Sequence, residues 1–457
     1  MRLPRTDPGR LALVLVLAAA VTAFTATVPL LRDWFDLRVY HGTVDSWIHH
    51  GGRIYDYRVP GTAYGFTYPP FAAVAMLPMS LLGLHAAVAV ALLLNLAALG
   101  FALHVLAGGA LRRHGWYGCA LAACALALFE PLRDTLSFGQ VNILLLALVL
   151  LDCRLLATGR SRWAGVGIGL AAAIKLTPAA FIGLLLVAGR RRAAAVATAV
   201  ALAATALAAW IVPDASRFYW THAMGDTTRI GRLDYVSNQS LQGVLARLDL
   251  TDRAVWAVLV LMVLGVWAVR TRRAVGAGDW TAAFALTGLT ACLVSPITWV
   301  HHLVWLLPSF AVLVRAGHPR VAGGLYALLC TSVVWLWFDD ASGVDGFLGS
   351  NTYVWITLAL LLRLPIGQSC ADRSTPLPRS ASDMAPAPIP AAPAIAHASG
   401  QPTAPTPPAP PRGPASAATG SFTGPGLGLA RKASSDPTGS TRPAAPNPQS
   451  SSSPASS

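Results

Sequence analysis

The feature that most constrains this chain is a series of long apolar runs separated by short clusters of arginine. The first run covers residues 11–31, and about 20 residues of helix are enough to cross a hydrocarbon core of about 30 Å. Further apolar runs follow up to about residue 365, so we interpret the first run as a membrane anchor and not as a cleaved signal peptide. The sequence therefore predicts an all-α membrane protein with many crossings.

Composition supports the same fold class. Of the 457 residues, 54% are hydrophobic and only 12% are charged, whereas a typical soluble domain is about 25% charged. A soluble enzyme of this length would lack the polar side chains needed to cover its surface. The net charge of +14 lies in short clusters between apolar runs and accompanies no nucleic-acid-binding motif, so we expect no nucleic-acid partner.

The arginine clusters also predict an orientation, because short cytoplasmic loops carry an excess of basic residues. We expect both termini in the cytoplasm of a plasma-membrane protein. The outward-facing connections are then 32–68, 131–139, 213–252, 295–301 and 339–351. The arginines that we place inside are Arg2, Arg5, Arg10, Arg112, Arg113, Arg160, Arg162, Arg190, Arg191, Arg192, Arg270, Arg272, Arg273, Arg315, Arg320 and Arg363.

This orientation requires an odd number of crossings between residues 69 and 108 and an even number between 163 and 189. The second stretch carries Lys175 and Pro178 at its middle, and each half is too short for a full span. Half-length helices can form a re-entrant hairpin where protein or water satisfies the free backbone groups. The predicted total is roughly 12 crossings or half-crossings.

The chain divides by composition into two parts. Residues 1–365 form the predicted multi-span membrane domain. Residues 366–457 are rich in Pro, Ala, Ser, Thr and Gly and contain no Trp or Tyr. Such a segment buries too little apolar surface to offset the entropy lost on ordering, so we predict a disordered cytoplasmic tail, either a spacer or a dispensable extension.

The first outward loop mixes aromatic residues with acids. Part of 36–50 is expected to form an amphipathic helix on the membrane surface. Asp36 lies about one helical turn beyond the first span. Its carboxylate is either placed at the membrane boundary to accept a proton or is an ordinary surface acid.

A second group of unusual residues surrounds Pro131, where we expect one span to end, and Gln140, near which the next begins. Glu130, the only glutamate, and Arg133 bracket this turn. Ionisable groups at membrane depth usually face a cavity or each other, so the two form either part of a site or an ion pair that fixes the turn. Gln140 and Asn142 are candidates for binding sugar hydroxyls, although Asn is more often a helix cap.

Lys175 lies in an otherwise apolar stretch and is one of two lysines in the chain. An ammonium group there needs a counter-ion, for which a lipid-linked phosphate or a buried aspartate would serve. The alternative is a side chain that extends to the membrane interface.

Two adjacent histidines, His301 and His302, follow Trp299 at the outer end of a span. Neighbouring side chains on a helix diverge by about 100°, so the pair is poorly placed to hold one metal ion. We therefore favour hydrogen bonds to phosphate or sugar over zinc, with interfacial packing as the alternative. In the outward loop 213–252, the run Asn238, Gln239, Ser240 either binds a sugar or caps the next helix.

No nucleotide-binding GxxxxGKS, GxSxG or HExxH pattern is present, so the sequence does not support ATP hydrolysis, α/β-hydrolase chemistry or zincin chemistry. A transporter or lipid flippase is the main alternative to an enzyme. Its charged residues would lie near the bilayer midplane. Most of the candidate site residues lie at the predicted outer face, which suits an enzyme with an extracytoplasmic active site. Lys175 is the exception, because it lies inside an apolar stretch as a transporter residue would.

Several of these features resemble, in order, glycosyltransferase family 87, the actinobacterial polyprenol-phosphate-mannose-dependent α-1,2-mannosyltransferases of the GT-C fold. The resemblance covers roughly residues 30–310, and six weak motifs in one order are fairly specific together. The motifs begin at Asp36 (DLRVY), Tyr68 (YPPF), Phe138 (FGQVN), Lys175 (KLTP), Asn238 (NQS) and Ser295 (SP, followed by Trp299, His301 and His302).

The resemblance implies a GT-C bundle whose active site faces the extracytoplasmic side, with Asp36 as the catalytic residue. The implied donor is polyprenyl-phosphate-mannose, and the acceptor is a mannosylated glycolipid such as a phosphatidylinositol mannoside, lipomannan or lipoarabinomannan. An arabinose-transferring GT-C enzyme is the nearest alternative. We expect the donor phosphate and sugar to contact His301, His302, Lys175, Arg133, Gln140 and Asn142, the acceptor to contact Tyr68, Asn238 and Gln239, and no metal or cofactor to be needed.

Overall fold

The computed structural model describes residues 6–27, 33–159, 162–250 and 252–367. Within these ranges the chain forms helices, and the only strand-like pairing is an isolated bridge between Arg58 and Gly65. The all-helical prediction is therefore confirmed for the described part of the chain. The predicted tail lies outside the described residues from residue 368 onward, as do the predicted cytoplasmic Arg2, Arg5 and Arg160.

Four described helices are long and apolar enough to cross a membrane, and a bent helix pair would make a fifth span. Shorter apolar helices include Thr177–Val187, Trp280–Val294, Val300–Arg315 and Thr352–Arg363. The helices identify a membrane protein, while the predicted total of about 12 crossings stays a prediction. The four long helices are α1 (Asp7–Thr27), α4 (Leu84–Leu128), α9 (Arg191–Ile211) and α12 (Arg253–Gly276).

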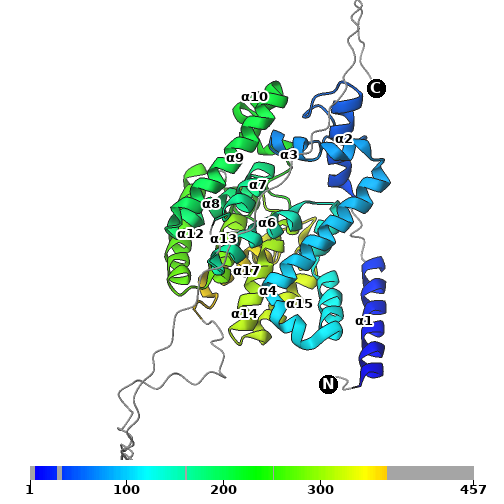
Figure 1. Cartoon of the computed structure of the whole chain (residues 1–457), viewed down its shortest axis with the longest axis vertical. Helices are drawn as coiled ribbons and strands as arrows, with labels where there is room; N and C mark the ends of the chain where they lie inside the picture. Colours follow the sequence, from blue (N-terminus) through cyan, green and yellow to red (C-terminus); the bar gives the residue numbers. More distant parts are fainter. Residues whose placement is uncertain (1–5, 28–32, 160–161, 251, 368–457) are drawn as a thin grey trace, which may run out of the picture. The chain divides into compact units, whose positions relative to one another are not determined.

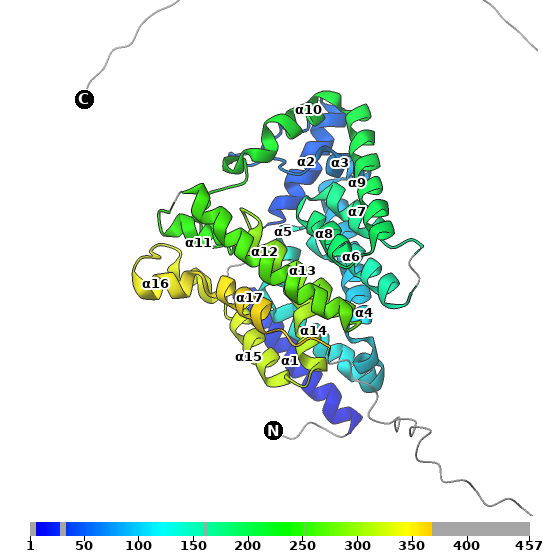
Figure 2. The same cartoon turned by 90° about the vertical axis from the view of Figure 1, so that its left-hand side faces the viewer.

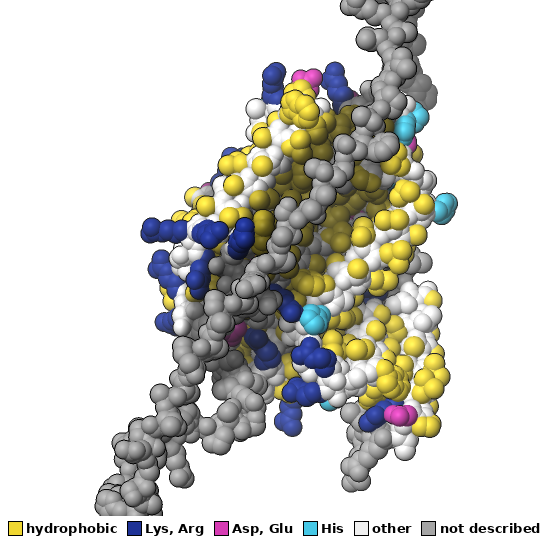
Figure 3. All heavy atoms as spheres, in the orientation of Figure 1, with side chains coloured by type: hydrophobic (Ala, Val, Ile, Leu, Met, Phe, Trp, Pro, Cys, Tyr) yellow, Lys and Arg dark blue, Asp and Glu magenta, His cyan; other side chains and the backbone are white. Residues whose placement is uncertain are grey.

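The outer surface of these helices is apolar. Leu202 and Trp210 of α9 are 64% and 81% exposed, and Leu261 of α12 is 66% exposed. On the face shown in Figure 3, hydrophobic side chains spread over the helices, while basic side chains gather mainly toward the left and lower edges. A soluble protein rarely exposes so much continuous apolar surface, whereas lipid is a suitable solvent for it.

Two helix breaks shape the middle of the chain. α4 is interrupted at Gly115, whose φ of 58° is accessible to glycine at little cost. The expected connection 131–139 is not a short turn, because Glu130–Phe138 forms helix α5, which meets α6 (Asn142–Ala157) at 117°. Pro131 starts a helix here instead of ending one, since the first helical turn needs no backbone N–H from proline.

The predicted half-length helices lie on either side of Lys175. They are α7 (Val166–Ile174) and α8 (Ala180–Val187), joined through the 3₁₀ turn η2 (Thr177–Ala179). α7 runs along α9 and α8 leads directly into the start of α9, so the chain reverses at Lys175 (Figure 2). Glycines permit this approach, because a Cβ atom at Gly165 would lie 2.2 Å from the Ala193 carbonyl oxygen.

The first segment that we expect to face outward contains α2 (Phe35–His49), which confirms the helix predicted within 36–50. One face of α2 is buried, including Leu37, Tyr40 and Val44. α2, α3 (Pro70–Ala75) and α10 (Pro213–Thr221) lie at the same end of the bundle in both views (Figures 1 and 2). This end also carries η1 (Leu77–Leu81), η3 (Ala223–Gly225) and η4 (Thr227–Arg229).

The core centres on α13 (Trp280–Val294), of which every residue except Thr281 and Val294 is buried. A helix that is apolar on all sides is stable only when other helices surround it, and α13 packs against α8, α12, α14 and α17. The remaining elements are α11 (Leu241–Arg247), η5 (Val300–Leu306), α14 (Leu307–Arg315), α15 (Pro319–Cys330), η6 (Val333–Trp337), α16 (Gly343–Ser350) and α17 (Thr352–Arg363).

Candidate functional site

Asp36 lies in the first turn of α2, and this turn is held against the corner between α5 and α6. The Trp34 backbone N–H donates a 3.0 Å hydrogen bond to the Ser137 carbonyl oxygen. Gly139 ends α5 with a φ of +71°, and a Cβ atom there would lie 2.6 Å from Leu37 Cβ. The glycine therefore permits both the left-handed turn and the close approach of α2.

The Asp36 carboxylate accepts a 2.7 Å hydrogen bond from Gln140 Nε2. Burial among the surrounding loops raises the pKa of Asp36 from 3.8 to about 6. The Gln140 hydrogen bond and the charge of Lys175 both lower it, which limits the rise. A carboxylate with a pKa just below neutral is charged at pH 7 and is a much stronger base than an exposed aspartate.

Two tyrosines extend the hydrogen-bond network from Gln140. Tyr68 Oη donates to Gln140 Oε1 at 2.8 Å, and Tyr40 Oη donates to Tyr68 Oη at 3.0 Å. Burial is the main reason why the pKa values of both phenols lie above 10, so both are neutral donors. The network thus orients the Gln140 amide, which in turn orients Asp36.

Lys175 enters this network from the break between α7 and α8. Its Nζ lies 3.2 Å from Tyr68 Oη and 2.9 Å from Asn142 Oδ1, and it lies over the Tyr68 ring at 5.0 Å from the centroid. None of the ion pairs within the described ranges involves Lys175. Of the two predicted counter-ions, the buried aspartate is therefore not found in contact with Lys175. Asp36 is joined to Lys175 through Gln140 and Tyr68.

His302 completes the contacts of Lys175. His302 Nδ1 accepts a hydrogen bond from the Trp299 backbone N–H at 3.1 Å, and His302 Nε2 lies 2.9 Å from Lys175 Nζ. A neutral ring that accepts at Nδ1 carries its hydrogen on Nε2. The imidazole N–H and the Lys175 amine then lie in direct contact, and an anionic oxygen bound beside them would accept a hydrogen bond from each.

His301 has different surroundings. Its ring packs edge-on against Phe138 with centroids 5.1 Å apart, and its plane is 84° from that of His302. Its carbonyl oxygen accepts hydrogen bonds from Thr135 and from Asn142 Nδ2. Asn142 therefore bridges Lys175 and the η5 backbone. The predicted capping role of Asn142 is not found, because its side chain makes these two contacts instead.

Arg133 lies outside this network. Its guanidinium donates a 3.0 Å hydrogen bond to Ser332 Oγ and lies over the Phe24 ring of α1. Glu130 accepts hydrogen bonds from Trp335 Nε1 at 2.7 Å and from Tyr353 Oη. The predicted ion pair of Glu130 with Arg133 does not occur among the described ion pairs. The single glutamate instead ties α5 to η6 and α17.

Asn238 and Gln239 are fully buried and bind the backbone. Asn238 Nδ2 donates to the Leu233 and Pro296 carbonyl oxygens, and its Oδ1 accepts from the Thr298 N–H. Gln239 Nε2 donates to Ser350 O at 2.7 Å. The structure does not bring these two side chains to Asp36 or Lys175. The alternative of a helix cap is confirmed for Ser240, which accepts a hydrogen bond from the Gly243 N–H at the start of α11.

Comparison with known proteins decides the family. The profile of Glycosyltransferase family 87 matches residues 66–296. This chain belongs to glycosyltransferase family 87. The family predicted from six short motifs is thus confirmed, and the chain is a membrane glycosyltransferase. No solved structure matches this family 87 chain.

Curated relatives of this family 87 chain come from mycobacteria. A "polyprenol-phosphate-mannose-dependent alpha-(1-2)-phosphatidylinositol mannoside mannosyltransferase" of Mycobacterium tuberculosis is 31% identical over 393 residues, which covers 77% of this chain and 89% of the relative. A "polyprenol-phosphate-mannose-dependent alpha-(1-2)-phosphatidylinositol pentamannoside mannosyltransferase" of Mycolicibacterium smegmatis is 35% identical over 356 residues, 73% of this chain and 83% of the relative.

Tyr40 is a member of the network that the sequence analysis of this family 87 chain did not predict. Tyr40 follows Asp36 by four residues, and this spacing places both on one face of α2. A helix prediction for 36–50 combined with this spacing would have found Tyr40. Within the described ranges, no three His, Cys, Asp or Glu side chains lie close enough to hold a metal ion together.

Proposed function

We propose that this chain transfers mannose from polyprenyl-phosphate-mannose to a mannosylated glycolipid, forming an α-1,2 linkage. The relatives of M. tuberculosis and M. smegmatis, 31% and 35% identical, support this proposal, because their names give this donor, this linkage and phosphatidylinositol mannoside acceptors. A phosphatidylinositol mannoside is the first acceptor in our proposal. Lipomannan and lipoarabinomannan are mannosylated lipids of the same chemical class.

The observation that carries the mechanism is the connection of Asp36 to Lys175 through Gln140 and Tyr68. We assign Asp36 as the general base. Its carboxylate takes the proton of the acceptor 2-hydroxyl while the hydroxyl oxygen attacks the anomeric carbon of mannose. A β-linked donor then gives an α-linked product in one displacement, with inversion and without a covalent glycosyl-enzyme.

The leaving group is the polyprenyl phosphate of the donor. A phosphate monoester has a second pKa of about 6, so the group leaves without an obligatory proton donor and mainly requires positive charge around its oxygens. Lys175 and His302, whose side-chain nitrogens lie 2.9 Å apart, supply the charge and the hydrogen-bond donors in this proposal. The mannosyl-phosphate bond itself activates the sugar, so the mechanism includes no nucleotide, metal or other cofactor.

The remaining assigned residues differ in their contacts with Asp36 and Lys175. Gln140 and Asn142 contact Asp36 and Lys175 and thereby set the donor subsite. His301 lies beside His302, and its ring borders the same corner. Among the described residues, no contact links Arg133 to Lys175 or His302, and its guanidinium donates to Leu128 O and Ser332 Oγ. Among the proposed acceptor ligands, Tyr68 lies in the network, whereas the contacts of Asn238 and Gln239 suit a role in fixing the segment before His302.

We also propose that the site faces the extracytoplasmic side of the plasma membrane, with both termini inside and a GT-C arrangement of about 12 crossings or half-crossings. One helix connects Leu84 to the break at Gly115. Arg112 and Arg113 adjoin this break, whereas α2 and α3 precede the other end of α4. The positive-inside rule then places α2 and Asp36 outside.

Reconstitution tests the proposed function. The purified protein is supplied with decaprenyl-phosphate-mannose or decaprenyl-phosphate-arabinose and with phosphatidylinositol mannoside, lipomannan or lipoarabinomannan. We expect mannose transfer to phosphatidylinositol mannoside and digestion of the product by an α-1,2-specific mannosidase. Transfer of arabinose alone, or substrate counterflow in vesicles without any sugar transfer, would overturn the proposal. An Asp36→Asn variant gives the background rate.

A further inference from the structure

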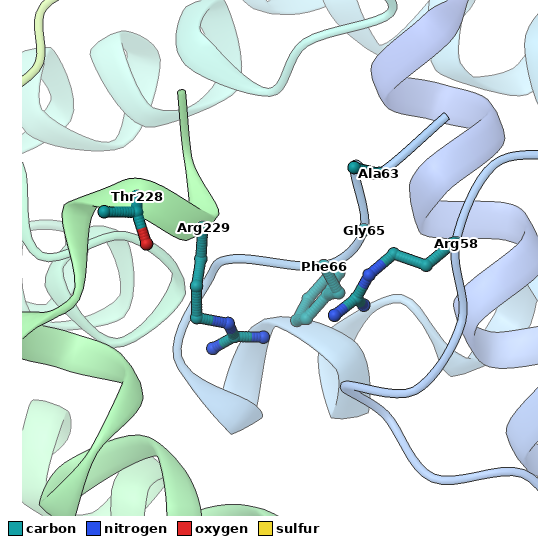
Figure 4. Close-up of a pocket in the computed structure, with 6 residues that line it drawn as sticks. All are labelled: Arg58, Ala63, Gly65, Phe66, Thr228 and Arg229. Carbon is teal, nitrogen blue, oxygen red and sulfur yellow. The ribbon is translucent and has the colours of Figure 1, made fainter. Parts of the chain in front are cut away.

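A second polar site lies beside the Asp36 network, and its main feature is a pair of arginines. Arg58 comes from the segment between α2 and α3, and Arg229 ends η4. Figure 4 shows the two side chains extending toward each other across a cavity, with the Phe66 ring beside them. The cavity has a volume of about 190 Å³ and is lined by Arg58, Ala63, Gly65, Phe66, Thr228 and Arg229.

Neither arginine takes part in an ion pair within the described ranges. Arg58 Nη1 donates to the Tyr55 and Tyr57 carbonyl oxygens at 2.8 and 3.0 Å. The Arg229 guanidinium lies over the Tyr55 and Phe218 rings, with centroids 5.3 and 5.1 Å away. Two guanidinium groups therefore converge without a carboxylate between them.

The charge of Asp226 favours the charged form of Arg229, but within the described ranges Asp226 forms no ion pair with either arginine. Asp226 Oδ1 accepts hydrogen bonds from the backbone and the hydroxyl group of Thr228, at 3.0 and 2.6 Å, and so caps η4. Burial first and the neighbouring Arg58 second lower the pKa of Arg229. Like charges that face one cavity repel each other, and a bound anion with two or more oxygens would relieve that repulsion through charge-assisted hydrogen bonds.

A larger cavity of about 460 Å³ shares both arginines. It also contains three aromatic side chains, Trp47, Tyr55 and Phe218, and the two acids Asp56 and Asp214. Aromatic faces pack against the apolar faces of sugar rings, and carboxylates accept hydrogen bonds from sugar hydroxyls. The combination of a cationic part and an aromatic, acidic part suits a headgroup that contains both phosphate and sugars.

Aromatic packing connects the arginine pair to the reaction centre. The Phe66 ring, which lines the smaller cavity, packs edge-on against Tyr68 with centroids 5.9 Å apart and against Tyr40 at 6.3 Å. Tyr55 Oη, which lies beside Arg229, donates a 2.8 Å hydrogen bond to the Tyr68 carbonyl oxygen. The cavity is thus separated from the Asp36 network by a single layer of aromatic side chains.

We propose that Arg58 and Arg229 bind the phosphodiester of the acceptor lipid and that the larger cavity holds sugar residues of its headgroup. This inference rests on the proposed function. A phosphodiester is common to the donor and the acceptor, and we assign this site to the acceptor because the proposed function already assigns the donor phosphate to Lys175 and His302. The chain would then select anionic glycolipid acceptors over neutral mannosides of the same sugar sequence.

The test measures the transfer kinetics of the full-length protein with two different acceptors. Phosphatidylinositol dimannoside carries the phosphodiester, and an octyl dimannoside lacks it. We expect the double variant Arg58→Gln/Arg229→Gln to raise the KM for phosphatidylinositol dimannoside at least about tenfold, since hydrogen bonds to charged groups are the strong ones. The KM for decaprenyl-phosphate-mannose and the rate with octyl dimannoside should not change.

Arg232→Gln is the matched control, because Arg232 lies in the same segment but is exposed and paired with Asp234. An increase in the donor KM instead of the acceptor KM would assign the phosphate site to the donor and overturn the proposal. An equal loss with both acceptors would reduce the arginines to a structural role and would also overturn it. An Arg58→Lys/Arg229→Lys variant should recover part of the affinity, because it retains the charge.

Direct binding separates this inference from the proposed function. Titration of the protein in detergent with phosphatidylinositol dimannoside, followed by tryptophan fluorescence, needs no turnover. If the chain transfers no mannose at all, weaker binding by the double variant still supports the phosphate site. If transfer occurs and the double variant binds the lipid as tightly as the parent chain does, the phosphate site is wrong and the proposed function stands.

Discussion

The Asp36 carboxylate and the Gln140 side-chain amide are joined by a 2.7 Å hydrogen bond across 104 positions of the sequence. The bond forms because the first turn of α2 is held against the α5–α6 corner, where Trp34 donates to Ser137 and Gly139 leaves room for Leu37. A donor fixed in this way selects one carboxylate orientation. It also favours the charged form of Asp36, which is the form that accepts a proton.

Replacement of the proposed base, Asp36, is the first prediction. Asp36→Asn should lower kcat/KM at pH 7.5 by at least about 100-fold, since general bases contribute about 10²–10⁴. In the parent chain, Asp36 has a pKa of about 6, so kcat/KM should fall about tenfold for each pH unit below 6. Initial rates measured between pH 5 and 8 check both points. An unchanged rate in Asp36→Asn would remove Asp36 from the mechanism.

The hydrogen bond from Gln140 should control the pH below which kcat/KM falls, that is, the position of the acid limb of the pH profile. Gln140→Leu removes a donor that favours the carboxylate, and Gln140→Glu adds a second carboxylate beside Asp36; each change raises the pKa of Asp36. The acid limb of the kcat/KM profile should therefore move above pH 6 in both variants. Asn95→Leu is the control, because the Asn95 amide is buried in α4 and donates only to Ala91 of its own helix. A limb that stays at pH 6 in both variants would contradict this role.

The donor subsite predicts a separate kinetic effect. Lys175→Met and His302→Ala should each lower kcat/KM for the donor by about 10- to 100-fold, the value of a lost hydrogen bond to a charged group. The KM for the acceptor should change little. Arg154→Met is the matched control, because it also removes one positive charge but lies at the exposed end of α6. If the donor kinetics of both variants equal those of the parent chain, the phosphate lies elsewhere.

Gly139 offers a test of the contact between α2 and α5. Gly139→Ala places a Cβ atom 2.6 Å from Leu37 Cβ at a φ of +71°, so it should lower both the melting temperature and the transfer rate. Gly61→Ala shares the positive φ, +77°, but has no heavy atom within 4 Å. The free energy of unfolding of Gly61→Ala should fall only by the cost of the left-handed backbone, about 1–2 kcal/mol. Full activity in Gly139→Ala would show that the position of Asp36 does not depend on this contact.

Thiol labelling tests the orientation. In a background with Cys119→Ser, a membrane-impermeant maleimide should label Thr62→Cys in intact cells, because Thr62 is exposed in the segment before α3. Arg113→Cys, next to the break in α4, should react only after permeabilisation. Labelling of Arg113→Cys and protection of Thr62→Cys would reverse the proposed topology.

Local sequence patterns predicted individual helices and breaks more reliably than they predicted which side chains meet. The helix over 36–50 and the break at Lys175 follow from local patterns, amphipathic spacing in one case and a polar KLTP run between apolar halves in the other. The helix over 130–138 was missed because Pro131 was interpreted as an end signal, and proline fits both after a helix and in its first turn. Local sequence does not distinguish these two positions.

The family and the membrane character were determined by the sequence itself, because apolar runs and short motifs are local properties. The grouping of site residues was decided by the tertiary structure. Six motifs in one order did not show that Lys175 meets Tyr68 and His302 while Arg133 turns toward Ser332. Nor did they show that Arg58 and Arg229 share a cavity. Such contacts depend on how the helices pack around buried α13. This packing brings together side chains that lie more than a hundred positions apart in the sequence, which local patterns do not report.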